Sequence, residues 1–217
     1  MNTPEFHRYS VFDTLIREVD HVLNNICCEQ PSSRDYPADQ CENFSTLSAQ
    51  EKKQAAGLMR VNHAGEVSAQ ALYQGQSLTA RDSMLRDKLK SASIEESDHL
   101  NWCRRRLNEL GEEPSKLDPL WYLGSFALGI TAGIAGDRWN LGFLAETEYQ
   151  VVRHLENHLK RLPKKDIRSR AIIIQMKEDE LGHAHLAEEL GAAELPSPVK
   201  SLMKLTSKVM TTVAERI

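Results

Sequence analysis

Two short motifs of the same kind, Glu-x-x-His, occur in this sequence at residues 96–99 and 180–183. A glutamate and a histidine three residues apart lie on one face of a helix, so both side chains can reach the same ligand. Each motif also follows a lone glutamate, Glu66 or Glu148, which lies 30 or 32 residues before the glutamate of the motif. A single motif would be ordinary on a solvated helix face, whereas a matched pair indicates a repeated structural unit.

The spacing of these residues predicts two antiparallel helical hairpins. Two residues lie at the same height in a hairpin when its turn is midway between them, and the midpoints here fall at residues 81 and 164. Asp82 is a typical N-cap residue and Pro163 interrupts helices, so both midpoints coincide with expected turns. Packed together, the two hairpins form an all-α four-helix bundle whose core receives four carboxylates and two imidazoles.

Start and stop signals place the four helices of this bundle. Ser48 and Glu51 form a capping-box pattern at the start of the first helix, and Gly111 suits the end of the second. The predicted helices cover about residues 48–80, 83–110, 137–161 and 166–190.

The six inward side chains predict a site for two metal ions. Buried carboxylates are costly unless they are neutralised, and four carboxylates balance the charge of two divalent cations. Mixed oxygen and nitrogen ligands favour iron or manganese over structural zinc, and this ligand set is typical of dinuclear iron or manganese sites in four-helix bundles. We expect Glu96 and Glu180 to bridge the ions; the alternative is a bundle whose glutamates and histidines face water. The predicted metal-ligating and catalytic residues are Glu66, Glu96, His99, Glu148, Glu180 and His183.

Several neighbouring residues allow two interpretations. Gly65 and Gly75 predict either space beside the metal site or close helix packing. His63 is either a ligand-side residue or a core histidine, and His154 with His158 forms a pair four residues apart that suits a partly exposed face. Asp98 and Asp179 could hold the outer nitrogens of the ligand histidines, but each would have to reach another helix, because neither lies on the ligand face of its own.

Two further segments have unusual patterns. Residues 119–136 carry no charge, and they predict a crossover between the hairpins that is interfacial or substrate-lining, buried in the core, or membrane-spanning. Residues 199–217 predict a basic amphipathic helix. In that helix Lys200, Lys204 and Lys208 recur every four residues, which suits either an anionic membrane surface or a capping helix with a solvated lysine stripe.

The first residues of the chain and the amino-acid composition limit where the protein is expected in the cell and what it is expected to bind. Residues 1–45 predict an amphipathic helix at about 10–28 and a polar linker, followed by one helical domain at 46–217. The formal net charge of −4 gives no case for nucleic-acid binding. No signal or transit sequence is expected, and the four cysteines form no C-x-x-C motif, so we expect free thiols in the cytoplasm.

The sequence around the motifs resembles the demethoxyubiquinone hydroxylase family. The resemblance covers about residues 48–217 and every ligand that the repeat predicts. Tyr149 is a departure, because some members have an acid directly after the third ligand glutamate, and this puts the local proton or electron path in question. The segments that carry the resemblance are Leu58–Glu66 with Tyr73–Gln76, Glu96–Leu100, Leu123–Gly129, Glu148 with His154, and Asp179–His183.

The resemblance implies a ferritin-like fold that holds two iron ions. It implies a monooxygenase that uses molecular oxygen to hydroxylate the ring of a polyprenyl methoxy-methyl-benzoquinol, demethoxyubiquinol, in ubiquinone biosynthesis. It further implies peripheral binding to the cytoplasmic face of a bacterial cell membrane, electrons from reduced nicotinamide or a quinol, and contact with other ubiquinone-biosynthesis proteins. The alternatives are a ferritin-like ferroxidase and a non-catalytic quinone- or lipid-binding accessory protein.

Overall fold

The computed structural model describes residues 33–41 and 46–217, and within these ranges the chain contains helices and no strands. The helix predicted at about residues 10–28 lies outside the described residues. The elements are the 3-10 helix η1 (Pro37–Gln40) and the α-helices α2 (Ala49–Thr79), α3 (Ser83–Leu110), α4 (Asp118–Ile134), α5 (Asp137–Arg161), α6 (Ile167–Glu189) and α7 (Ser197–Ala214). The four predicted bundle helices are α2, α3, α5 and α6, and their ends agree with the prediction to within about one residue.

The local signals that predicted these ends act as expected. Ser48 accepts a hydrogen bond from the backbone N–H of Glu51, whose side chain accepts one from the backbone of Ser48, so the capping box is complete. Asp82 caps α3 in the turn of the first hairpin. Gly111 ends α3 with a φ of 78°, a left-handed conformation that glycine adopts without strain.

The four bundle helices enclose two apolar clusters at different levels. One cluster contains Met59, Leu107, Leu155 and Met176, which contribute one residue from each bundle helix. The other is built in the same way from Tyr73, Leu89, Leu144 and Ala187. In every helix the predicted ligand glutamate lies between its two cluster residues in sequence, so the polar side chains meet between the two clusters.

The crossover helix α4 packs closely along α2. A Cβ atom at Gly75 would lie against the carbonyl oxygen of Phe126, and one at Gly129 would lie against the carbonyl oxygen of Leu72, in each case closer than real atoms approach. Gly75 therefore permits close helix packing, which is one of its two predicted roles. A Cβ atom at Gly65, in contrast, would meet nothing within 4 Å.

This packing predicts opposite effects for the same substitution at two sites of α2. Gly75→Ala is expected to lower the free energy of unfolding by about 1–3 kcal/mol, because α4 would have to move away from α2. Gly65→Ala is the matched control, and it is expected to be neutral or stabilising by up to ~1 kcal/mol through helix propensity. Chemical denaturation followed by circular dichroism measures both; equal effects would contradict the close contact.

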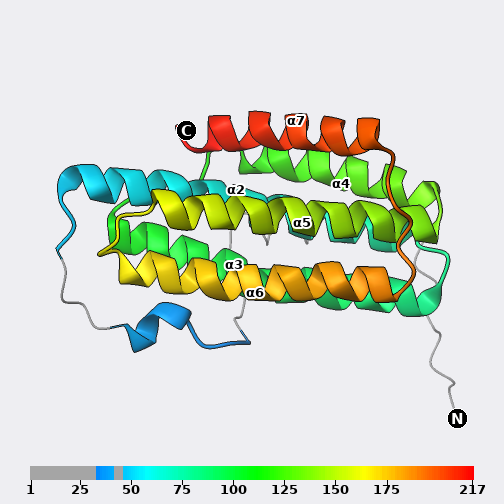
Figure 1. Cartoon of the computed structure of the whole chain (residues 1–217), viewed down its shortest axis with the longest axis horizontal. Helices are drawn as coiled ribbons and strands as arrows, with labels where there is room; N and C mark the ends of the chain where they lie inside the picture. Colours follow the sequence, from blue (N-terminus) through cyan, green and yellow to red (C-terminus); the bar gives the residue numbers. More distant parts are fainter. Residues whose placement is uncertain (1–32, 42–45) are drawn as a thin grey trace, which may run out of the picture.

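The outer faces of α4 and α7 expose large apolar side chains. The two helices run along the same side of the bundle, away from α3 and α6 (Figure 1). The buried-core prediction for residues 119–136 is wrong. The C-terminal helix packs on α2 through Ala214, as a capping helix would, but its Leu202 and Leu205 are 64% and 59% exposed. Among the described residues, no helix is long and apolar enough to cross a bilayer. The exposed residues, here called the apolar face, are Leu120, Leu123, Leu128, Ile134, Val199, Leu202, Leu205 and Val209.

Residues 33–41, here called the N-terminal strap, pack against α3 and α6 rather than extending as a linker. Tyr36 and Ala38 are buried and belong to the first apolar cluster. Arg105 lies 4.0 Å from the centre of the Tyr36 ring and forms an ion pair with Asp39. Two small apolar contacts in a polar sequence give no periodic pattern, so the composition of this segment did not predict its docking.

Candidate metal centre

All four bundle helices contribute to one buried cluster of acids and imidazoles. Glu66 comes from α2, Glu96 and His99 from α3, Glu148 from α5, and Glu180 and His183 from α6. All are buried except His183, which is 13% exposed at its side chain. The structure thus brings together all six residues that the sequence singles out.

His99 lies at the centre of one half of this cluster. Its Nδ1 atom is 3.1 Å from a carboxylate oxygen of Glu96, 3.1 Å from one of Glu180 and 3.6 Å from one of Glu66. One ligand atom from each of these four residues lies within 4.8 Å of the others, which is the spacing of donors around a single cation.

His183 occupies the corresponding position in the other half. Its Nδ1 atom is 3.2 Å from Glu180 and 3.4 Å from Glu96. Glu96 and Glu180 therefore each contact both histidines, as the prediction of bridging carboxylates requires. Glu148 belongs to this half, because the charges of Glu180 and His183 both act on its carboxylate.

Tyr73 is a polar neighbour that the sequence did not single out as functional. Its buried hydroxyl donates a hydrogen bond to Oε1 of Glu148, and its ring lies edge-on to His183 with centroids 6.4 Å apart. Its position seven residues after Glu66, on the same helix face, was the available signal.

The charges of the cluster are unbalanced without a cation. Burial raises the pKa of Glu66 and of Glu148 well above the ordinary value, and the nearby Glu180 and Glu96 raise both further. Burial alone would lower the pKa of His183, but hydrogen bonds to Glu180 and Glu96 outweigh it and raise the pKa to about 12. The metal-free site thus holds extra protons, which cations would displace on binding.

The outer nitrogen of each ligand histidine contacts an acid from the opposite helix. Nε2 of His99 lies 2.9 Å from Oδ2 of Asp179 on α6, and Nε2 of His183 lies 3.0 Å from Oε2 of Glu95 on α3. The prediction that Asp179 serves another helix is confirmed. Glu95 was missed, although it precedes Glu96 as Asp179 precedes Glu180, so comparing the two repeats would have found it.

Two other residues that the sequence offered as neighbours of the metal site, Asp98 and His63, lie outside the cluster. Asp98 accepts hydrogen bonds from the backbone N–H and hydroxyl of Ser33 in the strap, whereas the Nε2 atoms of the two ligand histidines contact Asp179 and Glu95. His63 is buried with its Nδ1 atom 3.0 Å from Asp118 at the start of α4, as the core interpretation expects.

The pair His154 and His158 also lies apart from the cluster. The prediction of a partly exposed face is wrong for His158, which is fully buried and donates a hydrogen bond from Nδ1 to Asn62 over 2.7 Å. The two rings are in edge contact, with centroids 3.9 Å apart. Burial lowers the pKa of His154 to about 4 and that of His158 to about 2.

This buried pair predicts a loss of stability in mild acid. In the unfolded chain both histidines have a pKa of 6.5 and bind protons below that pH, whereas in the folded protein their pKa values are lower. The free energy of unfolding therefore falls as the pH drops below 6.5. We expect a loss of about 2 kcal/mol per histidine between about pH 7 and about pH 5. Denaturant titrations at both pH values test this, with His154→Gln/His158→Gln as the comparison; an equal loss in the double variant would contradict it.

The donor set of the cluster fits two divalent cations. It offers four carboxylates and two imidazole Nδ1 atoms, with a buried position for each ion beside a histidine. Among the residues that the structure describes, no cysteine belongs to the cluster, and Cys103 lies in the core against the sulfur of Met176. Oxygen and nitrogen donors of this kind suit iron or manganese.

Comparisons with known proteins identify the family of this chain and agree with its fold. The family model described as ubiquinone biosynthesis protein COQ7 matches residues 53–214. A 3-demethoxyubiquinol 3-hydroxylase of Chromobacterium violaceum is 58% identical over 207 residues, covering 95% of this chain and 100% of that protein. A protein of the same name from Cupriavidus taiwanensis is 54% identical over 206 residues, covering 94% of this chain and 100% of that protein.

A solved structure shows the same fold at low sequence identity. It is the dodecameric thioferritin, a bacterioferritin-related protein, of Bacteroides fragilis, with a TM-score of 0.54 and 15% identity over 66% of this chain and 85% of that one. This likeness supports a ferritin-like four-helix bundle and says nothing of activity. On the sequence match, which covers most of the chain, this protein belongs to the ubiquinone biosynthesis protein COQ7 family.

Proposed function

We propose that this protein is a di-iron monooxygenase that hydroxylates the ring of a polyprenyl demethoxyubiquinol in ubiquinone biosynthesis. The observation that carries the proposal is the buried cluster of four glutamates and two histidines in a member of this family. The names of its relatives support the substrate. Two ferrous ions would balance the four carboxylates and would supply the activation of molecular oxygen when bound.

The six cluster residues would act as the metal ligands. Glu96 and Glu180 would bridge the two ions because each contacts both histidines. Glu66 would be terminal on the His99 side, and Glu148 would be terminal on the His183 side.

The surrounding residues would prepare these ligands. Asp179 and Glu95 accept the Nε2–H of the two histidines, which leaves each Nδ1 lone pair free to face the ions. Tyr73 fixes the orientation of Glu148 through its hydroxyl. The apolar clusters above and below the site exclude water from the reacting ring.

The hydroxylation needs electrons that the chain does not carry. One oxygen atom of O₂ enters the C–H bond of the ring, and the other leaves as water after taking up two electrons and two protons. Reduced nicotinamide or a quinol would be the donor, and the sequence has no Gly-x-Gly-x-x-Gly fingerprint for a dinucleotide domain. Other ubiquinone-biosynthesis proteins are possible partners in delivering electrons or substrate.

The apolar face of α4 and α7 would bind the cytoplasmic surface of the membrane that holds the substrate. A polyprenyl tail leaves a bilayer only at ~0.8 kcal/mol per CH₂ group, so the enzyme has to meet the ring at the surface. Lys204 and Lys208 are exposed on α7 and would contact anionic headgroups. In this proposal residues 46–217 are the catalytic domain, and residues 1–45 are an N-terminal extension.

The test is complementation of a bacterial strain that lacks its own demethoxyubiquinol hydroxylase. Expression of this chain should consume the accumulated demethoxy precursor and restore ubiquinone, as measured by mass spectrometry of extracted quinones. Glu66→Ala should restore neither. Persistence of the precursor with well-expressed wild-type protein would refute the proposed reaction, and a ferroxidase or an accessory protein would give that result.

A further inference from the structure

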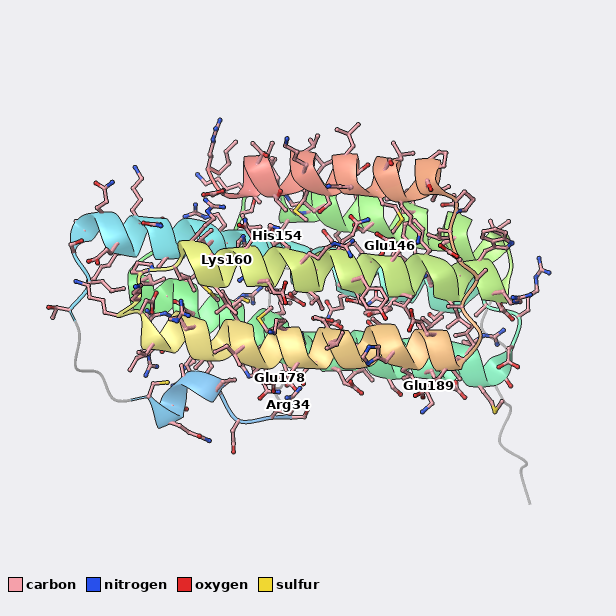
Figure 2. The ribbon with its side chains drawn as sticks, in the orientation of Figure 1. Arg34, Glu146, His154, Lys160, Glu178 and Glu189 are labelled. Carbon is pink, nitrogen blue, oxygen red and sulfur yellow. The ribbon has the colours of Figure 1, made fainter. Side chains whose placement is uncertain are left out.

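The two ligand histidines differ in how firmly the acid beside each of them is held, and the difference comes from a residue of the strap. Asp179, which accepts from His99, is itself held by Arg34, which donates two hydrogen bonds to its two oxygens over 2.7 and 3.2 Å. Figure 2 shows Arg34 beneath α6, on the side of the bundle away from α7. We propose that Arg34 is a positioning residue for the metal centre, through which the strap makes the His99 metal position bind more tightly than the His183 position.

The strap is anchored on both sides of Arg34. Ser33 donates from its backbone N–H and its hydroxyl to the buried Asp98, over 2.7 and 2.8 Å. Tyr36 is buried in the core, and the carbonyl of Ala38 accepts a hydrogen bond from Arg168 over 2.8 Å. An arginine on a free segment would lose entropy in pairing with Asp179, whereas these contacts place Arg34 in advance.

Around Asp179 the contacts converge on one carboxylate. Gln175 donates to Oδ1 over 3.0 Å, and the guanidinium of Arg34 lies 5.0 Å from the centre of the Trp102 ring. The Trp102 ring in turn lies 5.2 Å from the His99 ring. A two-bond arginine–carboxylate pair fixes both oxygens in one plane, so the acceptor for Nε2 of His99 has little freedom to rotate.

The corresponding acid on the other side lacks this support. Glu95 is 55% exposed at its side chain, whereas Asp179 is 19% exposed. Within the described part of the chain, Glu95 forms no ion pair with an arginine or a lysine, and its only hydrogen-bond partner is His183. His183 is itself the more exposed ligand, at 13% against 1% for His99.

This inequality has a consequence for metal binding. Acids that orient a metal-ligating histidine typically contribute a factor of 10–100 to metal affinity, because they hold the ring and its tautomer. Asp179, held by Arg34, would therefore raise the metal affinity on the His99 side more than the exposed Glu95 raises it on the His183 side. The inference rests on the proposed metal centre, and it predicts two unequal sites within it.

The test is an anaerobic titration of the metal-free full-length protein with Co²⁺, followed by calorimetry and by the visible absorption of bound cobalt. Wild-type protein should bind two ions with affinities that differ by about 10- to 100-fold. Arg34→Ala should weaken the tighter site by about 10-fold or more and shift its absorption band, while the weaker site stays unchanged. Arg34→Lys, which keeps the charge but loses the two-bond geometry, should restore the affinity only in part.

Arg153→Ala is the matched control, because it breaks an exposed ion pair with Glu146 that touches no ligand. It should leave both affinities unchanged.

If wild-type protein binds two ions and Arg34→Ala binds them identically, the strap has no positioning role although the metal centre stands. If wild-type protein binds no cobalt, the metal centre and this inference both fail. Thermal unfolding separates a general loss of fold from a loss at one site, and equal weakening of both sites would also contradict the inference.

Discussion

Replacing Glu180 with glutamine is expected to remove at least one metal ion per chain and to lower hydroxylation by more than ~100-fold, since even outer residues of metal sites typically contribute 10- to 100-fold. Glu180 is one of the two carboxylates that contact both ligand histidines, and an amide cannot supply the missing negative charge or bridge two cations. Metal content by plasma mass spectrometry and turnover of a short-chain demethoxyubiquinol measure the two effects.

Glu178→Gln is the matched control for this substitution. Glu178 lies on the same helix two residues earlier, and its side chain points outward from α6 (Figure 2). Its replacement should change neither metal content nor turnover by more than ~2-fold, because surface substitutions away from special features have small effects. Full metal content and activity in Glu180→Gln would show that the cluster is not the metal site.

The second large effect is expected at the membrane. Leu202→Glu/Leu205→Glu should weaken binding to vesicles of phosphatidylethanolamine and phosphatidylglycerol on the order of 100-fold, because two leucines that would enter the interface become charged. Turnover of the long-chain quinol in vesicles should fall in parallel. Turnover of a short-chain soluble quinol should stay within ~2-fold of wild type, because the cluster is unchanged.

Met84→Glu tests whether the effect belongs to the apolar face. Met84 is 74% exposed near the start of α3, and its replacement adds one negative charge. The helix α3 lies on the other side of the bundle from α7 (Figure 1). Vesicle flotation should show binding close to that of wild type. A loss of binding free energy in Met84→Glu of half that in the double variant, in proportion to one added charge against two, would mean that net charge, and not the apolar face, governs membrane binding.

The bundle and the meeting of the six residues could be predicted from sequence because two independent constraints coincide. Helix periodicity fixes which residues share a face, and the spacing from Glu66 to Glu96 and from Glu148 to Glu180 fixes the heights at which they meet. The turns at residues 80–82 and 162–166 lie where that spacing requires them. Capping residues act within one turn of helix, so the helix ends could also be predicted from the sequence.

The contacts around the six residues were harder to predict from the sequence, because they depend on how the helices are rotated about their axes and on which segments pack against them. Glu95 could have been found from the repeat, but Arg34 lies in a polar segment whose docking depends on two buried side chains, Tyr36 and Ala38. The buried His158 likewise contacts a different helix, through its hydrogen bond to Asn62 on α2. The periodicity of one segment gives no information about its contacts with a segment that is distant in the sequence.

Whether the six residues hold two iron ions is measured by the iron stoichiometry and Mössbauer spectrum of wild-type protein loaded anaerobically with ⁵⁷Fe²⁺ and then exposed to oxygen. We expect two iron ions per chain and, after oxidation, a magnetically coupled pair with no net spin, because Glu96 and Glu180 contact both halves of the site. One iron ion per chain, or two ions without magnetic coupling, would contradict this expectation.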